Sequence, residues 1–224
     1  MTVHPPLPAV LLSVPVVPVL RIEDPQLGVL AARALISGGL SVLEVTLRTR
    51  HALDVVRALR DALPEAVIAA GTILDPSHVR SAAEAGAQLL FSPGGSEALS
   101  MAAADHGCPL IPGVSTPSEV MAALGRGHRL LKFFPASANG GPPLLEAMRG
   151  PFPHARFCPT GGIRLASMGS YLALENVRCV GASWLVRDSD LGARDWAGIE
   201  AKAVQACEVA ARAGWKACSD MSAW

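Results

Sequence analysis

The chain has 224 residues, half of them hydrophobic, a size that suits one well-buried core better than two full domains. Its 19 basic and 19 acidic residues balance, which argues against the broad basic face that binds nucleic acid or anionic lipid. The first residues lack the basic start and apolar run of a signal peptide, and no apolar stretch is as long as a membrane span, so we expect a soluble, cytoplasmic protein.

Short apolar runs alternate with amphipathic segments along the chain. Strands are predicted at 16–20, 42–45, 67–70, 88–91, 110–112, 130–133, 155–158 and 177–181. Helices are predicted at 26–38, 51–62, 76–85, 95–106, 116–125, 142–149, 166–173 and 195–213. Such alternation indicates parallel βαβ units, and eight of them can close into a barrel. We therefore expect one α/β domain over 1–224, a (β/α)8 TIM barrel, whose first residues (about 1–14) precede the first strand and form a short helix over the barrel bottom.

Active sites in these barrels lie at the carboxyl ends of the strands, where Lys132 falls. Only three of the basic residues are lysines, and Lys202 and Lys216 belong to the C-terminal helical region. Lys132 instead stands in an apolar run (LLKFF, 130–134), where a charge is costly unless it is paired. An arginine stays protonated, whereas a lysine can become a nucleophile. A lysine that merely extends to solvent from a strand end is the alternative.

Glu44 is the matching carboxylate in an apolar strand. Alternation along 42–48 (VLEVTLR) predicts that Glu44, Thr46 and Arg48 share one face. The second and sixth strands lie opposite each other in an eight-stranded barrel, so Glu44 and Lys132 can both point into its mouth. A proton shuttle beside an imine-forming lysine is one interpretation, and a structural ion pair is the other. Arg48 is suited to clamp a substrate carboxylate.

The loops after the last two predicted strands contain Gly161, Gly162 and Ser183. Glycines let backbone N–H groups approach an anion closely, and these loops often hold phosphate in such barrels. A plain turn explains a Gly-Gly pair equally well.

Cysteines and histidines give no sign of a metal site or a disulfide framework. The number of cysteines, five, is odd, and no two of them form a CxxC motif. The six histidines are isolated from one another in the sequence. Cys108, Cys158 and Cys179 lie in or beside apolar runs, where we expect small buried hydrophobes.

With these residues in hand, the chain resembles the family of 2-keto-3-deoxy-6-phosphogluconate (KDPG) and 4-hydroxy-2-oxoglutarate (KHG) aldolases. The matching blocks run in order from about residue 15 to 186, and their combination is highly specific. They are PVVPV (15–19), LEVTLRT (43–49), GT (71–72), SPG (92–94), IPGVST (111–116), KFFPA (132–136), NGG (139–141), FCPTGGI (157–163) and GASW (181–184).

The resemblance implies a class I lyase of the Entner–Doudoroff pathway that needs no metal or other cofactor and forms a homotrimer. It assigns the Schiff base to Lys132 and the acid/base role to Glu44. The substrate-binding residues that it implies are Arg48, Thr72 and Pro93 for the pyruvoyl group, Thr160 for the reacting hydroxyl, and Gly161, Gly162 and Ser183 for the phosphate. The partner is then a small phosphorylated 2-keto acid, with no nucleic acid and no membrane.

Two positions depart from the family pattern. Ser137 stands where many relatives carry a glutamate, and Arg21 extends a first strand that often ends in an apolar residue. We expect Ser137 to leave the chemistry unchanged and Arg21 to reach the barrel mouth. Residues after about 187 carry no family motif.

Alternatives to KDPG cleavage differ in substrate or in class. A sister aldolase would act on the galactonate epimer or on 4-hydroxy-2-oxoglutarate, and the surroundings of Thr160 would decide between them. A non-catalytic phosphate-binding barrel has no reason to place Lys132 and Glu44 inside strands.

Overall fold

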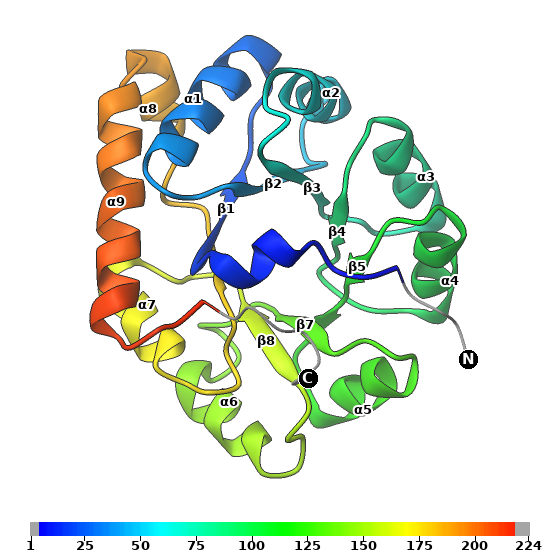
Figure 1. The fold of residues 1–224 in the computed structure, drawn as a ribbon. Helices are drawn as coiled ribbons and strands as arrows, with labels where there is room; N and C mark the ends of the chain where they lie inside the picture. Colours follow the sequence, from blue (N-terminus) through cyan, green and yellow to red (C-terminus); the bar gives the residue numbers. More distant parts are fainter. Residues whose placement is uncertain (1–4, 218–224) are drawn as a thin grey trace.

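The computed structural model describes residues 5–217, except the side chains of residues 10 and 12. Parallel strands form a closed ring with helices around the outside (Figure 1). The strands are β1 (Val16–Leu20), β2 (Val42–Thr46), β3 (Val67–Gly71), β4 (Leu89–Phe91), β5 (Leu110–Ile111), β6 (Gly113–Val114), β7 (Leu130–Phe133), β8 (Arg156–Pro159) and β9 (Val180–Ala182). The predicted (β/α)8 barrel is confirmed.

The helices alternate with the strands along the chain, and five of them have an N-cap side chain that accepts from a backbone N–H group. The helices are η1 (Ala9–Ser13, a 3-10 helix), α1 (Pro25–Ser37), α2 (Ala52–Ala62), α3 (Pro76–Glu84), α4 (Glu97–Asp105), α5 (Pro117–Gly125), α6 (Gly141–Arg149), α7 (Leu165–Leu172), α8 (Asp188–Ala193) and α9 (Trp196–Arg212). Asp75 caps α3 by accepting from two backbone N–H groups, and Thr116 and Glu119 form a capping box on α5.

The ring closes at two irregular points. Six strands pair in the order β5-β4-β3-β2-β1-β9, and three in the order β6-β7-β8. The predicted fifth strand is divided at Pro112, which has no N–H to donate but accepts from the Lys132 N–H at 2.9 Å. The chain thereby changes partners, with β5 beside β4 and β6 beside β7.

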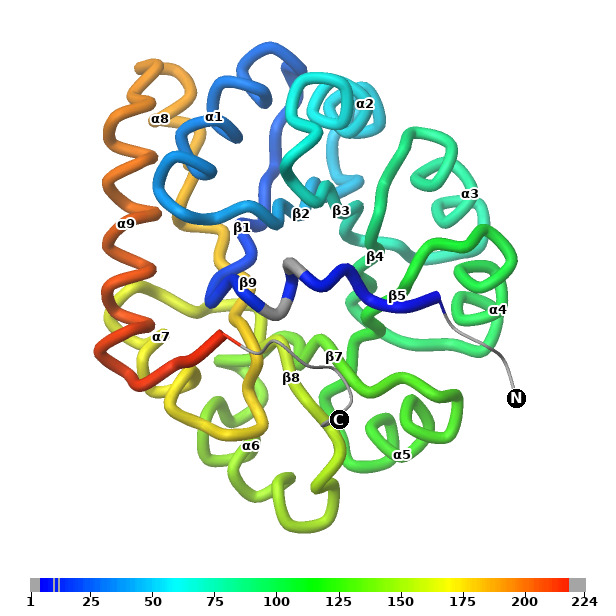
Figure 2. The backbone as a smooth tube through the Cα atoms, in the orientation of Figure 1, coloured from blue at the N-terminus to red at the C-terminus, as the bar shows by residue number. Residues whose placement is uncertain are grey.

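The second closure joins β8 to β9, which lies between β1 and β8 (Figure 2). Two isolated bridges join the strands, Phe157 to Val177 and Thr160 to Gly181. Between the two bridges, the β9 side contains one more residue than the β8 side. This bulge explains why regular pairing begins at Val180, later than the predicted strand at 177–181. Helix α8 was not predicted, because its six residues give too short a pattern to recognise.

The core has two layers. One lies between the strands and the outer helices. The other fills the barrel interior toward the amino ends of the strands, where η1 crosses the ring (Figure 1). There Leu11 and Val14 pack on the first strand residues Val42, Val67 and Leu130. A short helix over the barrel bottom was predicted within about residues 1–14; it is present at Ala9–Ser13, and residues 1–4 lie outside the described residues. Cys158 and Cys179 belong to this layer, and Cys108 is buried in the other.

Candidate active site

Lys132 and Glu44 meet inside the barrel, as predicted. Lys132 Nζ lies 3.0 Å from Glu44 Oε1, and the two side chains are only 6% and 1% exposed. The residues beside them in register are mostly small: Gly113 and Cys158 flank Lys132, and Ala69 flanks Glu44. These neighbours leave room for a lysine and a glutamate in a barrel that is otherwise filled by side chains.

Gly71, at the end of β3, leaves the space that the Glu44 carboxylate occupies. A Cβ at this position would lie 2.0 Å from Glu44 Oε1 and 2.6 Å from its Cδ. Any side chain larger than hydrogen would therefore displace the carboxylate. The next residue, Thr72, has a φ of +60°, a left-handed conformation that is rare for a β-branched residue. Backbone strain of this kind is concentrated at functional sites.

Two aromatic rings face the Lys132 amine. The ring centroids of Phe91 and Phe134 lie 5.4 and 5.6 Å from Nζ, within cation–π range. Phe91 is not among the site residues predicted from the sequence. Its place as the last residue of an apolar strand, directly before the SPG block, is the signal that marks it.

Arg48 is not on the strand face shared by Glu44 and Thr46, which corrects the sequence-based prediction. Strand β2 ends at Thr46, whose Oγ1 donates to the Leu20 carbonyl at 2.9 Å. Arg48 lies in the following turn, exposed, with its N–H donating to the Thr46 carbonyl at 2.8 Å. Within residues 5–217 it makes no ion pair, so its guanidinium at the barrel mouth is available to a carboxylate.

Pro93 belongs to a tightly held loop after β4. Ser92 Oγ donates to the Ile73 carbonyl at 2.6 Å, and Gly113 N–H donates to the Gly94 carbonyl at 3.1 Å. A Cβ at Gly113 would lie 2.1 Å from the Pro93 backbone. This close approach fixes the half-buried Pro93 beside the end of β6.

Thr160 is buried at the carboxyl end of β8. It is 6% exposed, and its Oγ1 donates to the Cys158 carbonyl at 3.3 Å. Gly181 on the adjoining strand makes room for it, since a Cβ there would lie 2.3 Å from Thr160 Oγ1.

Gly161 and Gly162 have positive φ values of 101° and 75°. The Gly161 carbonyl accepts from Ser137 N–H at 3.0 Å, and a Cβ at Gly162 would lie 2.7 Å from Ser137. Neither glycine N–H donates a hydrogen bond to another part of the described chain. Ser183 follows β9 on the neighbouring strand and is exposed. Free N–H groups and a hydroxyl on adjoining loops can hold an anion.

Arg21 lies just after β1 and is exposed. Its Nη1 lies 3.7 Å from Asp188 Oδ2 at the start of α8, and both side chains are more than half exposed. An exposed pair of this kind contributes little stability.

Residues 5–217 contain no cluster of three or more histidine, cysteine, aspartate or glutamate side chains arranged to hold a metal ion. Among the same residues, no helix combines the length and the apolar character needed to cross a membrane.

Comparison with known proteins gives consistent matches over most of the chain. The model of the KDPG and KHG aldolase family matches residues 7–202. The KHG/KDPG aldolase of Escherichia coli (strain K12) is 48% identical over 200 residues, which cover 89% of this chain and 94% of that protein. The 2-dehydro-3-deoxy-phosphogluconate aldolase of Pseudomonas aeruginosa is 43% identical over 193 residues, covering 86% of this chain and 88% of that protein.

Solved structures agree with these matches. A KDPG aldolase of Legionella pneumophila, with pyruvate captured as a covalent carbinolamine intermediate, has a TM-score of 0.85 at 40% identity and covers 89% of this chain and 97% of its own. The 3-keto-L-gulonate-6-phosphate decarboxylase of Vibrio cholerae has a TM-score of 0.66 at 18% identity, over 89% of this chain and 98% of its own, and is similar in fold alone.

Proposed function

The chain belongs to the KDPG and KHG aldolase family, and we propose that it cleaves KDPG to pyruvate and glyceraldehyde 3-phosphate through a Schiff base on Lys132. The observation that carries the proposal is the buried Lys132–Glu44 pair, with Nζ and Oε1 3.0 Å apart inside the barrel. Taking both charges out of water is costly, and a hydrophobic pair would fill the same space without that cost. An amine beside a proton acceptor is what imine chemistry requires.

The first half of the reaction forms the imine. The Lys132 amine attacks the C2 ketone of the substrate, and the resulting carbinolamine loses water to give an iminium. The carbinolamine in the Legionella pneumophila relative supports this covalent route. Glu44 lies within hydrogen-bond distance of the amine, so its carboxylate can take the proton that the amine must lose.

The second half breaks the carbon–carbon bond. Glu44, directly or through a water molecule, removes the C4 hydroxyl proton, and the electrons of the C3–C4 bond pass to the iminium. Glyceraldehyde 3-phosphate leaves and an enamine remains. Glu44 returns a proton to C3, and water hydrolyses the imine to free pyruvate and regenerate the Lys132 amine.

The remaining residues bind the substrate around this pair. Arg48, Thr72 and Pro93 hold the pyruvoyl group, with the Arg48 guanidinium as the partner of its carboxylate. Thr160, at the end of β8, faces the C4 hydroxyl. Gly161, Gly162 and Ser183 hold the phosphate, a role supported by their free N–H groups and by the exposed hydroxyl.

Two neighbouring substrates are the second candidates. The galactonate epimer differs at C4, the position that Thr160 faces, and 4-hydroxy-2-oxoglutarate lacks the phosphate. The second is favoured by the 48% identity to an aldolase named for both KHG and KDPG. An aldolase with a functional phosphate loop should turn over KDPG with a higher kcat/KM than the unphosphorylated substrate.

Borohydride reduction and a substrate series test the proposal together. Pyruvate plus borohydride should add one pyruvate-derived mass to a peptide that contains Lys132, and added chelator should leave turnover unchanged. Release of pyruvate should be fastest from KDPG. A label on Lys202 or Lys216 would overturn the Schiff-base assignment, and preference for another substrate would overturn only the choice of KDPG.

We also propose that the chain forms a homotrimer, as the family resemblance implies. Leu74, Met101 and Met121 are 58%, 51% and 64% exposed and lie in three successive βα units. Large apolar side chains at such positions are suited to contact another subunit. Light scattering after gel filtration should give three times the chain mass, and a monomer would contradict this proposal.

A further inference from the structure

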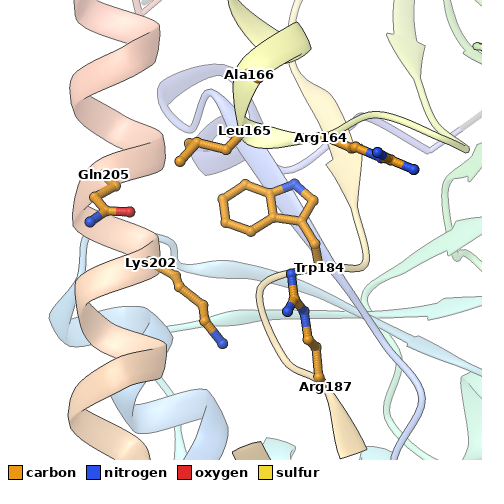
Figure 3. Close-up of a pocket in the computed structure, with 7 residues that line it drawn as sticks. All are labelled: Arg164, Leu165, Ala166, Trp184, Arg187, Lys202 and Gln205. Carbon is orange, nitrogen blue, oxygen red and sulfur yellow. The ribbon is translucent and has the colours of Figure 1, made fainter.

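A cavity of about 580 Å³ lies outside the barrel ring, between α7, α9 and the segment that links β9 to α8. This volume is within the range of small-molecule sites. Figure 3 shows the Trp184 indole in the middle of the site, with Lys202 and Gln205 of α9 on one side and Arg164 on the other. None of the residues that line it belongs to the proposed active site.

Every ionisable side chain that lines the cavity is a cation. Lys202 is already neutralised, because its Nζ lies 2.5 Å from Asp190 Oδ2. Arg164 and Arg187 make no ion pair within residues 5–217, although the Asp190 carboxylate also attracts the Arg187 charge from beyond ion-pair distance, so the cavity has an excess of positive charge. The planar guanidinium forks of the two arginines match the oxygens of a phosphate or carboxylate.

Trp184 supplies a second, independent feature. Its Nε1 is buried and has no hydrogen-bond partner within the described chain. A buried indole N–H is normally paired, and an unpaired one in a native structure calls for an explanation such as an absent ligand. The indole and Leu165 also provide the cavity with apolar surface.

We propose that this cavity binds an organic phosphate with a planar ring, whose phosphate lies between Arg164 and Arg187 and whose ring lies against Trp184. An oxygen of such a ligand can accept from the indole N–H after a small movement of the ring. The excess positive charge of the lining indicates an anionic group in the ligand, and the aromatic and aliphatic surface indicates a planar apolar body. Inorganic phosphate uses only the first of these contacts.

The residues that line the cavity are close in sequence to the loops proposed to hold the substrate phosphate. Trp184 directly follows Ser183, and Arg164 comes two residues after Gly162. The new site therefore shares chain segments with the proposed active site while using different side chains. Binding assays must distinguish the cavity from the proposed active site, and substitutions in one set of side chains or the other make this distinction possible.

Isothermal titration calorimetry with phenyl phosphate tests the proposal on the full chain. We expect binding to the unaltered protein at least tenfold tighter than that of inorganic phosphate or phenol. Arg164→Ala with Arg187→Ala should weaken binding of phenyl phosphate by about tenfold or more, since charge-assisted hydrogen bonds are lost. Trp184→Phe, which retains a ring but not the N–H, should weaken it less.

Two matched variants complete the experiment. Arg80→Ala removes an exposed arginine from α3 and should leave binding unchanged. Ser183→Ala alters the proposed substrate-phosphate loop and should also leave it unchanged. If Ser183→Ala weakens binding and the double arginine variant does not, the ligand occupies the barrel mouth and the proposal fails. Equal affinity for inorganic phosphate and phenyl phosphate would likewise overturn it. Unchanged melting temperatures verify that the variants are folded.

Discussion

The Lys132–Glu44 pair and the loops around Gly161, Gly162 and Ser183 meet at one mouth of the barrel but are built differently. The pair consists of side chains inside strands, almost fully buried and bounded by small residues in register. The loops offer backbone N–H groups in positive-φ conformations and an exposed hydroxyl. In the proposed reaction, the pair acts through the identity of its side chains, and the loops bind the phosphate through the conformation of their backbone. Substitutions should therefore have unequal effects.

The largest effect is expected at Lys132. Lys132→Arg keeps a cation but removes the nucleophile, so borohydride trapping of pyruvate and turnover should both be abolished. Mass spectrometry and a pyruvate-release assay measure the two. Lys202→Arg, which conserves charge away from the pair, should trap pyruvate normally. Residual turnover in Lys132→Arg above the background rate would refute the assignment.

Glu44→Gln should have the next largest effect. The amide retains the shape of the carboxylate but cannot accept a proton, so kcat should fall about 10²–10⁴-fold. Trapping with borohydride should persist at a lower rate. Rapid-quench and steady-state assays separate the two steps. A loss of only a few-fold would mean that Glu44 is a structural partner of Lys132.

Gly71→Ala tests whether the place of the carboxylate matters as much as its presence. The added methyl would lie 2.0 Å from Glu44 Oε1, so the carboxylate must move. A displacement of about 1 Å can reduce the rate by about 10²-fold. Gly125→Ala is the control, because a Cβ at Gly125 meets no atom within 4 Å. Equal kcat values for both variants would show that the position of Glu44 is not critical.

Ser183→Ala should have the smallest effect and a selective one. One hydrogen bond to a charged group contributes about 1.5–3 kcal/mol, so kcat/KM for KDPG should fall about 10- to 150-fold. Cleavage of 4-hydroxy-2-oxoglutarate, which has no phosphate, should change little. If both substrates lose activity equally, Ser183 supports the barrel instead of the phosphate.

The same contrast explains how much of the molecule could be predicted from its sequence. The barrel followed from alternating strands and helices, and Lys132 and Glu44 from charges in apolar strands, where their cost makes them conspicuous. The prediction for Arg48 was wrong because it assumed that β2 continues to residue 48. The strand ends at Thr46, where Thr46 Oγ1 donates to the Leu20 carbonyl, and Arg48 lies beyond it.

Other features depend on contacts that no local pattern contains. The division of the fifth strand at Pro112 depends on which neighbouring strand each half pairs with. The space that Gly71 leaves for Glu44 depends on two strands being in register. The left-handed Thr72 is held against the ordinary preference of its residue type, so propensity predicts the opposite.

Helix η1 and the apolar layer beside it close the barrel at the amino ends of the strands. Leu11, Val17 and Val42 have no exposed surface, so solvent does not enter from the amino ends of the strands. Substrate, products and water must then pass through the opposite opening, at the carboxyl ends of the strands. In the proposed reaction pyruvate is attached to the buried Lys132. The aldehyde must therefore leave through this opening before water can enter and release pyruvate. Closure of the barrel at the amino ends of the strands thus imposes ordered product release in the proposed reaction, with the aldehyde released before the keto acid.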